Sequence, residues 1–87
     1  MYHVYILRSI KNGRFYTGST DNIERRFHEH NSGHSKATKS GVPFEIIYTE
    51  SYNTRTEAYN REMYFKTGVG REELKYILSS RKQLEGH

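Results

Sequence analysis

The 87 residues suffice for one small hydrophobic core, so a single domain over residues 1–87 is expected. The absence of cysteine excludes disulfide frameworks, thiolate zinc sites and cysteine-based catalysis, and the lack of a signal-like start or of roughly 18 consecutive apolar residues predicts a cytoplasmic protein with no membrane contact. Fourteen Lys and Arg against ten Asp and Glu give a net charge of +4, which favours a polyanionic partner such as nucleic acid.

A β-hairpin is predicted at the start of the chain. Residues 2–8 alternate as a strand does, and both faces are bulky: one carries Tyr2, Val4 and Ile6, and the other carries His3, Tyr5 and Leu7. Such a strand suits the centre of a sheet. Asn12 and Gly13 both tolerate positive φ and predict a type I′ turn, after which residues 14–19 form the return strand.

A helix is predicted from about residue 21 to residue 32. Asp21 followed by Glu24 resembles a capping box, and Gly33 provides a C-terminal stop. The inward stripe of this helix carries Ile23, Arg26, Phe27 and His30. The two polar members of the stripe need partners, because burying an unpaired charge costs several kcal/mol.

The remaining sequence predicts a third strand and two further helices. A polar, cationic loop over residues 34–43 precedes a strand over residues 44–52 with alternating Phe44, Ile46 and Tyr48. Thr54 and Glu57 form a second capping box for a helix that ends near residue 66 and whose inward stripe is Ala58, Glu62 and Phe65. Residues 68–82 form the last helix, with Leu74, Ile77 and Leu78 inward. The order β-β-α-β-α-α indicates an α+β fold, a small three-stranded antiparallel sheet flanked by helices.

Five polar side chains are candidates for one site near an edge of the sheet: Tyr5, Tyr16, Arg26, His30 and Glu62. Two phenols, a guanidinium, an imidazole and a carboxylate are the groups that metal-assisted phosphodiester cleavage requires. A structural interpretation competes with this one, in which Arg26 pairs with Glu62 in a buried salt bridge, His30 is a satisfied core histidine and the tyrosines pack in strands. Gly18 either permits a close approach of the strand backbone to substrate or helix, or simply ends the strand.

The sequence resembles the GIY-YIG nuclease superfamily, and in particular its small stand-alone bacterial domain proteins. The two tripeptides are HVY, ending at Tyr5, and YTG, spanning Tyr16 to Gly18, and the first has His3 and Val4 in place of Gly and Ile. Arg26 and His30 follow in the next helix, and Glu62 follows in the later one. The resemblance covers nearly the whole chain and implies the GIY-YIG endonuclease fold.

This resemblance implies a metal-dependent endonuclease that cuts DNA, or alternatively RNA, with one divalent ion. Glu62 would hold Mg²⁺ or Mn²⁺. Tyr5 would orient or deprotonate the attacking water, with its pKa lowered by Arg26, while Tyr16 positions the phosphate and His30 orients the nucleophile or shares the proton. Two alternatives stay open, a nucleic-acid-binding module of the same fold with little or no catalysis, and a structural protein in which the polar set forms a buried network.

Several cations are candidates for phosphate contacts, in competition with a role as solvated surface: Arg14, Lys36, Lys39, Arg61 and Lys66. Lys66, one turn after Glu62, is also placed to support the site or to cap its helix. A chain of this size has no room for a separate targeting domain. Specificity is therefore expected from substrate shape or from a protein partner, or is absent.

Overall fold

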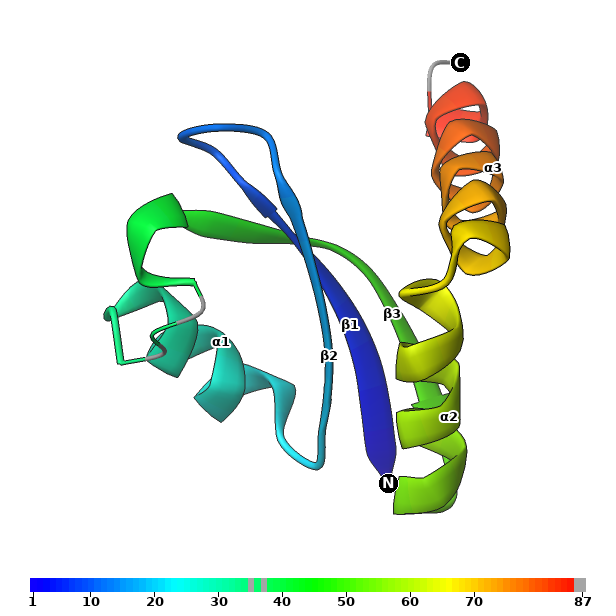
Figure 1. The fold of residues 1–87 in the computed structure, drawn as a ribbon, viewed down its shortest axis with the longest axis horizontal. Helices are drawn as coiled ribbons and strands as arrows, with labels where there is room; N and C mark the ends of the chain where they lie inside the picture. The colour runs from blue at the N-terminus through cyan, green and yellow to red at the C-terminus, as the bar shows by residue number, and fades with distance from the viewer. Residues whose placement is uncertain (35, 37, 86–87) are drawn as a thin grey trace.

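The structure, a computed structural model, describes residues 1–34, 36 and 38–85. Its elements are β1 (Tyr2–Ser9), β2 (Phe15–Thr20), α1 (Ile23–Asn31), a 3₁₀ turn η1 (Lys39–Gly41), β3 (Phe44–Tyr52), α2 (Arg55–Phe65) and α3 (Gly68–Glu85). The predicted α+β fold with the order β-β-α-β-α-α is confirmed. Figure 1 shows α1 on one side of the sheet, α2 on the other, and α3 continuing beyond the end of α2.

The sheet is antiparallel with the strand order β2-β1-β3, so β1 is the central strand, as its two bulky faces predicted. One face of β1 packs Val4 and Ile6 into a core with α2 and α3, formed with Ala58, Phe65 and Leu74. The other face packs Tyr5 and Leu7 against Phe27 of α1, together with Tyr16 of β2 and Phe44 of β3. Ile77 and Leu78 contact the first core, so the predicted inward stripe of the last helix is correct.

The hairpin forms where Asn12 and Gly13 predicted it, but the turn is of a different type. Gly13 has a φ of 76°, whereas Asn12 does not have positive φ, so the type I′ prediction is wrong. The N–H of Gly13 donates to the carbonyl of Ser9 (2.8 Å), and the Ser9 N–H donates to the carbonyl of Arg14 (2.8 Å). This wider loop needs left-handed backbone at one residue only, and a glycine occupies that residue.

The first helix begins one residue later than the capping pattern predicted. Asn22 is the N-cap, and its side chain accepts a hydrogen bond from the N–H of Arg25 (3.0 Å). Asp21 instead pairs with the Arg25 guanidinium (2.9 Å), so its predicted capping role is wrong. The second capping box is confirmed, because Thr54 Oγ1 accepts from the N–H of Glu57 (3.2 Å).

Strand β3 departs from the simple alternation predicted for Phe44, Ile46 and Tyr48. Ile6 pairs with Tyr48 but Leu7 pairs with Ile46, which leaves Ile47 as an extra residue. Such a bulge switches the side-chain pattern between faces. Phe44 therefore packs on the α1 side, Ile47 and Tyr48 both pack on the α2 side, and Ile46 is 37% exposed.

Within the described residues, no helix is both long enough and apolar enough to span a membrane.

Candidate active site

A buried hydrogen-bonded chain lies between β1 and α1. Tyr5 Oη lies 3.0 Å from Nε2 of His30, and Nδ1 of the same imidazole lies 2.7 Å from Oγ1 of Thr38. Tyr5 is 2% exposed and His30 is fully buried. The imidazole thus has a partner at each nitrogen, as the alternative of a satisfied core histidine anticipated.

Gly18 makes room for the Tyr5 phenol. The two residues are paired across β1 and β2, and a Cβ added at Gly18 would lie 2.5 Å from Cζ of Tyr5. Any larger residue at this position would force the ring to move. The close approach at Gly18 is made by the side chain of Tyr5, and not by the substrate or helix that was expected, and β2 continues past Gly18 to Thr20.

Arg26 and Tyr16 complete a cluster around Tyr5 and His30. The Arg26 guanidinium bonds Glu29 (3.1 Å), and its positive charge acts on the Tyr5 hydroxyl. The Tyr16 ring contacts the His30 ring edge-on, with 4.9 Å between centroids. Four of the five predicted site residues therefore meet on one face of the sheet. The alternative of a buried salt bridge from Arg26 to the later helix is wrong, because Arg26 pairs within its own helix.

The electrostatics of this cluster differ from the expectation for Tyr5. Burial raises the pKa of Tyr5 to about 12, and the neighbouring Arg26 guanidinium, which acts in the opposite direction, does not outweigh burial. Burial, together with the positive charge of Arg26, lowers the pKa of His30. At neutral pH the protein therefore presents a neutral phenol hydrogen-bonded to an uncharged imidazole, and the predicted lowering of the Tyr5 pKa by Arg26 is wrong as a net effect.

Glu62 reaches the same edge of the sheet from the opposite face. Its Oε1 accepts from Oγ of Ser19 (2.6 Å), its Oε2 accepts from Nζ of Lys66 (2.7 Å), and its side chain is 13% exposed. Side chains alternate along β2, so Ser19 points toward α2 while Gly18 faces Tyr5. The five residues form two groups on either side of β2 and not the single pocket that was expected. The groups are close enough for the Glu62 charge to contribute to raising the pKa of Tyr5.

The donor set at Glu62 suits a hard divalent cation held weakly. No group of three or more His, Asp or Glu side chains gathers anywhere in the part of the chain that the structure describes. Mg²⁺ commonly takes one or two carboxylates and fills its other positions with water and substrate phosphate. Glu62 is thus the side chain that could hold such an ion, and the Lys66 ammonium now supplies the positive charge beside it.

The comparison with known families gives the same architecture. A model of the GIY-YIG catalytic domain matches residues 1–78. The chain belongs to the GIY-YIG family. The resemblance inferred from HVY, YTG and the polar residues that follow is confirmed.

Relatives within the GIY-YIG family include UPF0213 proteins. One from Bacillus licheniformis is 34% identical over 82 residues, covering 93% of this chain and 84% of the relative. Another from Halobacterium salinarum is 39% identical over 67 residues, covering 76% of this chain and 86% of the relative. The solution NMR structure of a UPF0213 protein from Bacillus halodurans matches with a TM-score of 0.53 and 33% identity, over 88% of this chain and 85% of that one.

The cations predicted to contact phosphate occupy different settings on this GIY-YIG domain. Arg14 is exposed beside a hollow of about 140 Å³ that Tyr16 and Thr38 also line. Lys36 and Lys39 are exposed in the segment between α1 and β3. Lys66, 44% exposed, holds the carboxylate that would bind the ion.

Arg61 has a structural role that its sequence position did not reveal. Its guanidinium donates to Glu50 (2.9 and 3.2 Å) and to Glu73 (2.5 Å), and lies 4.3 Å from the centroid of the Phe65 ring. These bonds raise the pKa of Arg61, chiefly through Glu50. A guanidinium held between two carboxylates is a poor phosphate contact, so the assignment of Arg61 to nucleic acid is corrected.

Sequence reasoning missed several residues in or beside the candidate site. Ser19 bonds Glu62, which is distant in the sequence, and Thr38 bonds His30 across an irregular loop. Neither residue therefore carries a local sequence signal. Arg71 and Lys75 line a hollow of about 440 Å³ together with Tyr16 and Lys66. Their spacing of four residues on one helix would have placed them on a common face.

Proposed function

We propose that this GIY-YIG protein is an endonuclease that hydrolyses phosphodiester bonds in nucleic acid, with DNA as its main substrate and one Mg²⁺ or Mn²⁺ on Glu62. The observation that carries the proposal is the placement of Glu62 and of the Tyr5 cluster on opposite sides of one edge strand. Family membership supports the nuclease class, and the net charge of +4 supports a polyanionic substrate.

The edge of β2 is where substrate would bind. In the described part of the chain β2 pairs with β1 alone, which leaves its outer edge open. A phosphate at this edge would meet Glu62 from the α2 side and the cluster from the α1 side. A divalent ion bound there would neutralise phosphate charge and polarise the scissile bond. Arg26, 37% exposed, and the half-buried Tyr16 would hold the non-bridging oxygens.

The buried chain provides a route for the proton of the attacking water. The water would donate to the Tyr5 oxygen as Tyr5 passes its own hydroxyl proton to Nε2 of His30. This direction requires His30 to be protonated at Nδ1 and to donate to Oγ1 of Thr38, at 2.7 Å. An uncharged imidazole, kept so by burial, is the proper acceptor, and Tyr5 need not ionise in advance despite its pKa of about 12.

One observation favours a second candidate, a nucleic-acid-binding module with little catalysis. Tyr5 and His30 are almost completely buried, and a structural network would look the same. In that case Arg26, Lys66 and Arg71 would bind phosphates without a reaction.

Metal titration in a nuclease assay separates the two candidates. We expect the wild type to cut DNA only with Mg²⁺ or Mn²⁺, and Glu62→Ala to lose about 100-fold or more of the rate, because the ion supplies several kcal/mol to the transition state. Glu72→Ala is the matched control, since Glu72 is an exposed glutamate on α3. DNA binding without metal-dependent cleavage would favour the module, and neither binding nor cleavage would refute both candidates. RNA of the same sequence, tested in parallel, decides the substrate preference.

A further inference from the structure

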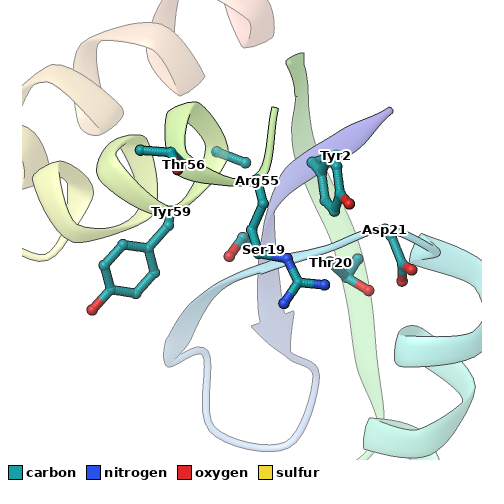
Figure 2. Close-up of a pocket in the computed structure, with 8 residues that line it drawn as sticks. Tyr2, Ser19, Thr20, Asp21, Arg55, Thr56 and Tyr59 are labelled. Atoms are coloured by element: carbon teal, nitrogen blue, oxygen red, sulfur yellow. The ribbon is translucent and has the colours of Figure 1, made fainter. Parts of the chain in front are cut away.

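A cavity of about 500 Å³ opens between the end of β2 and the first turns of α2. Figure 2 shows the lining residues Tyr2, Ser19, Asp21, Arg55 and Tyr59. Ala58 also lines the cavity. Ser19 belongs both to this lining and to the candidate active site, because its Oγ lies 2.6 Å from Oε1 of Glu62. Ser19 thus links the cavity to the carboxylate proposed to hold the ion.

We propose that this cavity is a nucleobase-binding subsite, which holds the base of a nucleotide adjoining the phosphate at Glu62. The inference rests on the proposed function, which it extends from a cleaved phosphate to a recognised neighbouring base.

The walls of the cavity offer the flat surfaces on which bases stack. The Arg55 guanidinium lies 5.5 Å from the centroid of the Tyr2 ring, and Tyr59 is 53% exposed. Figure 2 shows Tyr59 and Tyr2 on opposite sides of Arg55. Aromatic rings and guanidinium planes are the surfaces that bind unstacked bases. Ala58, which is 1% exposed and belongs to the core with Val4 and Ile6, also lines the cavity.

The polar groups of the cavity fit a base better than a second phosphate. Asp21 is half exposed at the rim, where its carboxylate pairs with the Arg25 guanidinium through Oδ1 (2.9 Å) and can also accept hydrogen bonds from the amino and ring N–H groups of bases. Phosphates have a better place on the other side of Glu62, where Lys66, Arg71 and Lys75 line the second hollow. A volume of about 500 Å³ lies within the usual range for small-ligand sites.

Nucleotide titrations of the metal-free protein, followed by amide NMR shifts, test the subsite. The probes are the four deoxynucleoside 5′-monophosphates, with 2-deoxyribose 5-phosphate as the ligand that lacks a base. We expect a monophosphate to shift the amides of Thr20, Asp21 and Thr56, and to bind at least tenfold more tightly than the sugar phosphate. Equal affinity of the two kinds of probe, shifts confined to other regions, or no binding at all would overturn the proposal.

A tyrosine variant with a matched control sharpens the test. Tyr59→Ala should weaken monophosphate binding about tenfold, the loss typical of one stacking contact. Tyr76→Ala, which removes another exposed tyrosine at 74% exposure on α3, should leave binding unchanged. An unchanged affinity in Tyr59→Ala, or an equal loss in both variants, would contradict the assignment.

Cleavage of DNA by the wild type with Mg²⁺, measured separately, distinguishes the two proposals. Cleavage without selective base binding would remove the subsite and leave the nuclease function intact. Base binding without cleavage would support the subsite and remove the nuclease function.

Discussion

Replacing Gly18 by alanine should damage the site through a single methyl group. The added Cβ would lie 2.5 Å from Cζ of Tyr5, well inside van der Waals contact. Tyr5 is 2% exposed on the central strand, so its ring has little room to retreat. The phenol would have to shift, and its 3.0 Å hydrogen bond to His30 would stretch or break.

The expected loss in the free energy of unfolding follows from the overpacking and from the weakened hydrogen bond. Overpacking of a filled core costs about 1–3 kcal/mol, and the loss of one buried hydrogen bond adds about 1 kcal/mol. We therefore expect Gly18→Ala to lower the free energy of unfolding by about 2–4 kcal/mol. In a domain of this size, that loss lowers the melting temperature by about 10–25 °C.

Thermal unfolding of Gly18→Ala beside Gly68→Ala provides the assay. At Gly68 an added Cβ meets nothing within 4 Å, so this control should melt within a few degrees of the wild type. Cleavage by Gly18→Ala, measured below its melting temperature, should also fall because Tyr5 is displaced. A variant that melts and cuts like the wild type would show that Tyr5 does not lie against β2 as described.

Three further outcomes follow from the contacts. Arg61→Ala should destabilise the fold by about 2–4 kcal/mol in urea unfolding, because Glu50, 15% exposed, loses its cationic partner; unchanged stability would mean that the ion pair is not structural. Thr38→Val should cost about 1–2 kcal/mol by removing the hydrogen-bond partner of buried His30, 2.7 Å away, and should slow cleavage; full activity would exclude the proton route. Tyr5 has a folded pKa of about 12 against an ordinary value of 10.0, so its stabilising contribution is complete below pH 10 and is lost as pH rises to 12, about 3 kcal/mol at 1.4 kcal/mol per pKa unit. Burial also raises the pKa values of Tyr48 and Tyr52 to about 12, so urea unfolding from pH 8 to 12 should show a larger decline in the wild type than in Tyr5→Phe, and equal declines would contradict the burial of the Tyr5 hydroxyl.

Local sequence signals predicted most of the fold. The two-faced alternation of residues 2–8 identified the central strand, and Thr54 with Glu57 marked the start of α2, because these features depend on neighbours in sequence. Local sequence signals did not decide which of two adjacent residues caps a helix or where a strand bulges. Asn22 and Asp21 are equally good caps in isolation, and the surrounding contacts decide between them. The bulge at Ile47 depends on pairing with β1, which no local pattern encodes.

The residue types of the candidate site could be read from the sequence, but their grouping could not. The family pattern selected Tyr5, His30 and Glu62, yet nothing in their spacing shows that Glu62 approaches β2 from the opposite face. Arg61 illustrates the same limit, since its partner Glu50 lies 11 residues away on a different element. The pKa of Tyr5 could not be predicted either, because burial raises it although the Arg26 guanidinium acts to lower it.

A crystal structure with Mn²⁺ and a DNA oligonucleotide made resistant to cleavage by a phosphorothioate would show whether Glu62 and the Tyr5 cluster bind one phosphate. We expect an anomalous peak on the Glu62 carboxylate, with one phosphate at the edge of β2 in contact with Arg26 and Tyr16. Lys66 should have moved from Oε2 of Glu62, where it now lies at 2.7 Å. A manganese ion bound elsewhere, or a phosphate that contacts Glu62 while remaining out of reach of the Tyr5 cluster, would contradict this expectation.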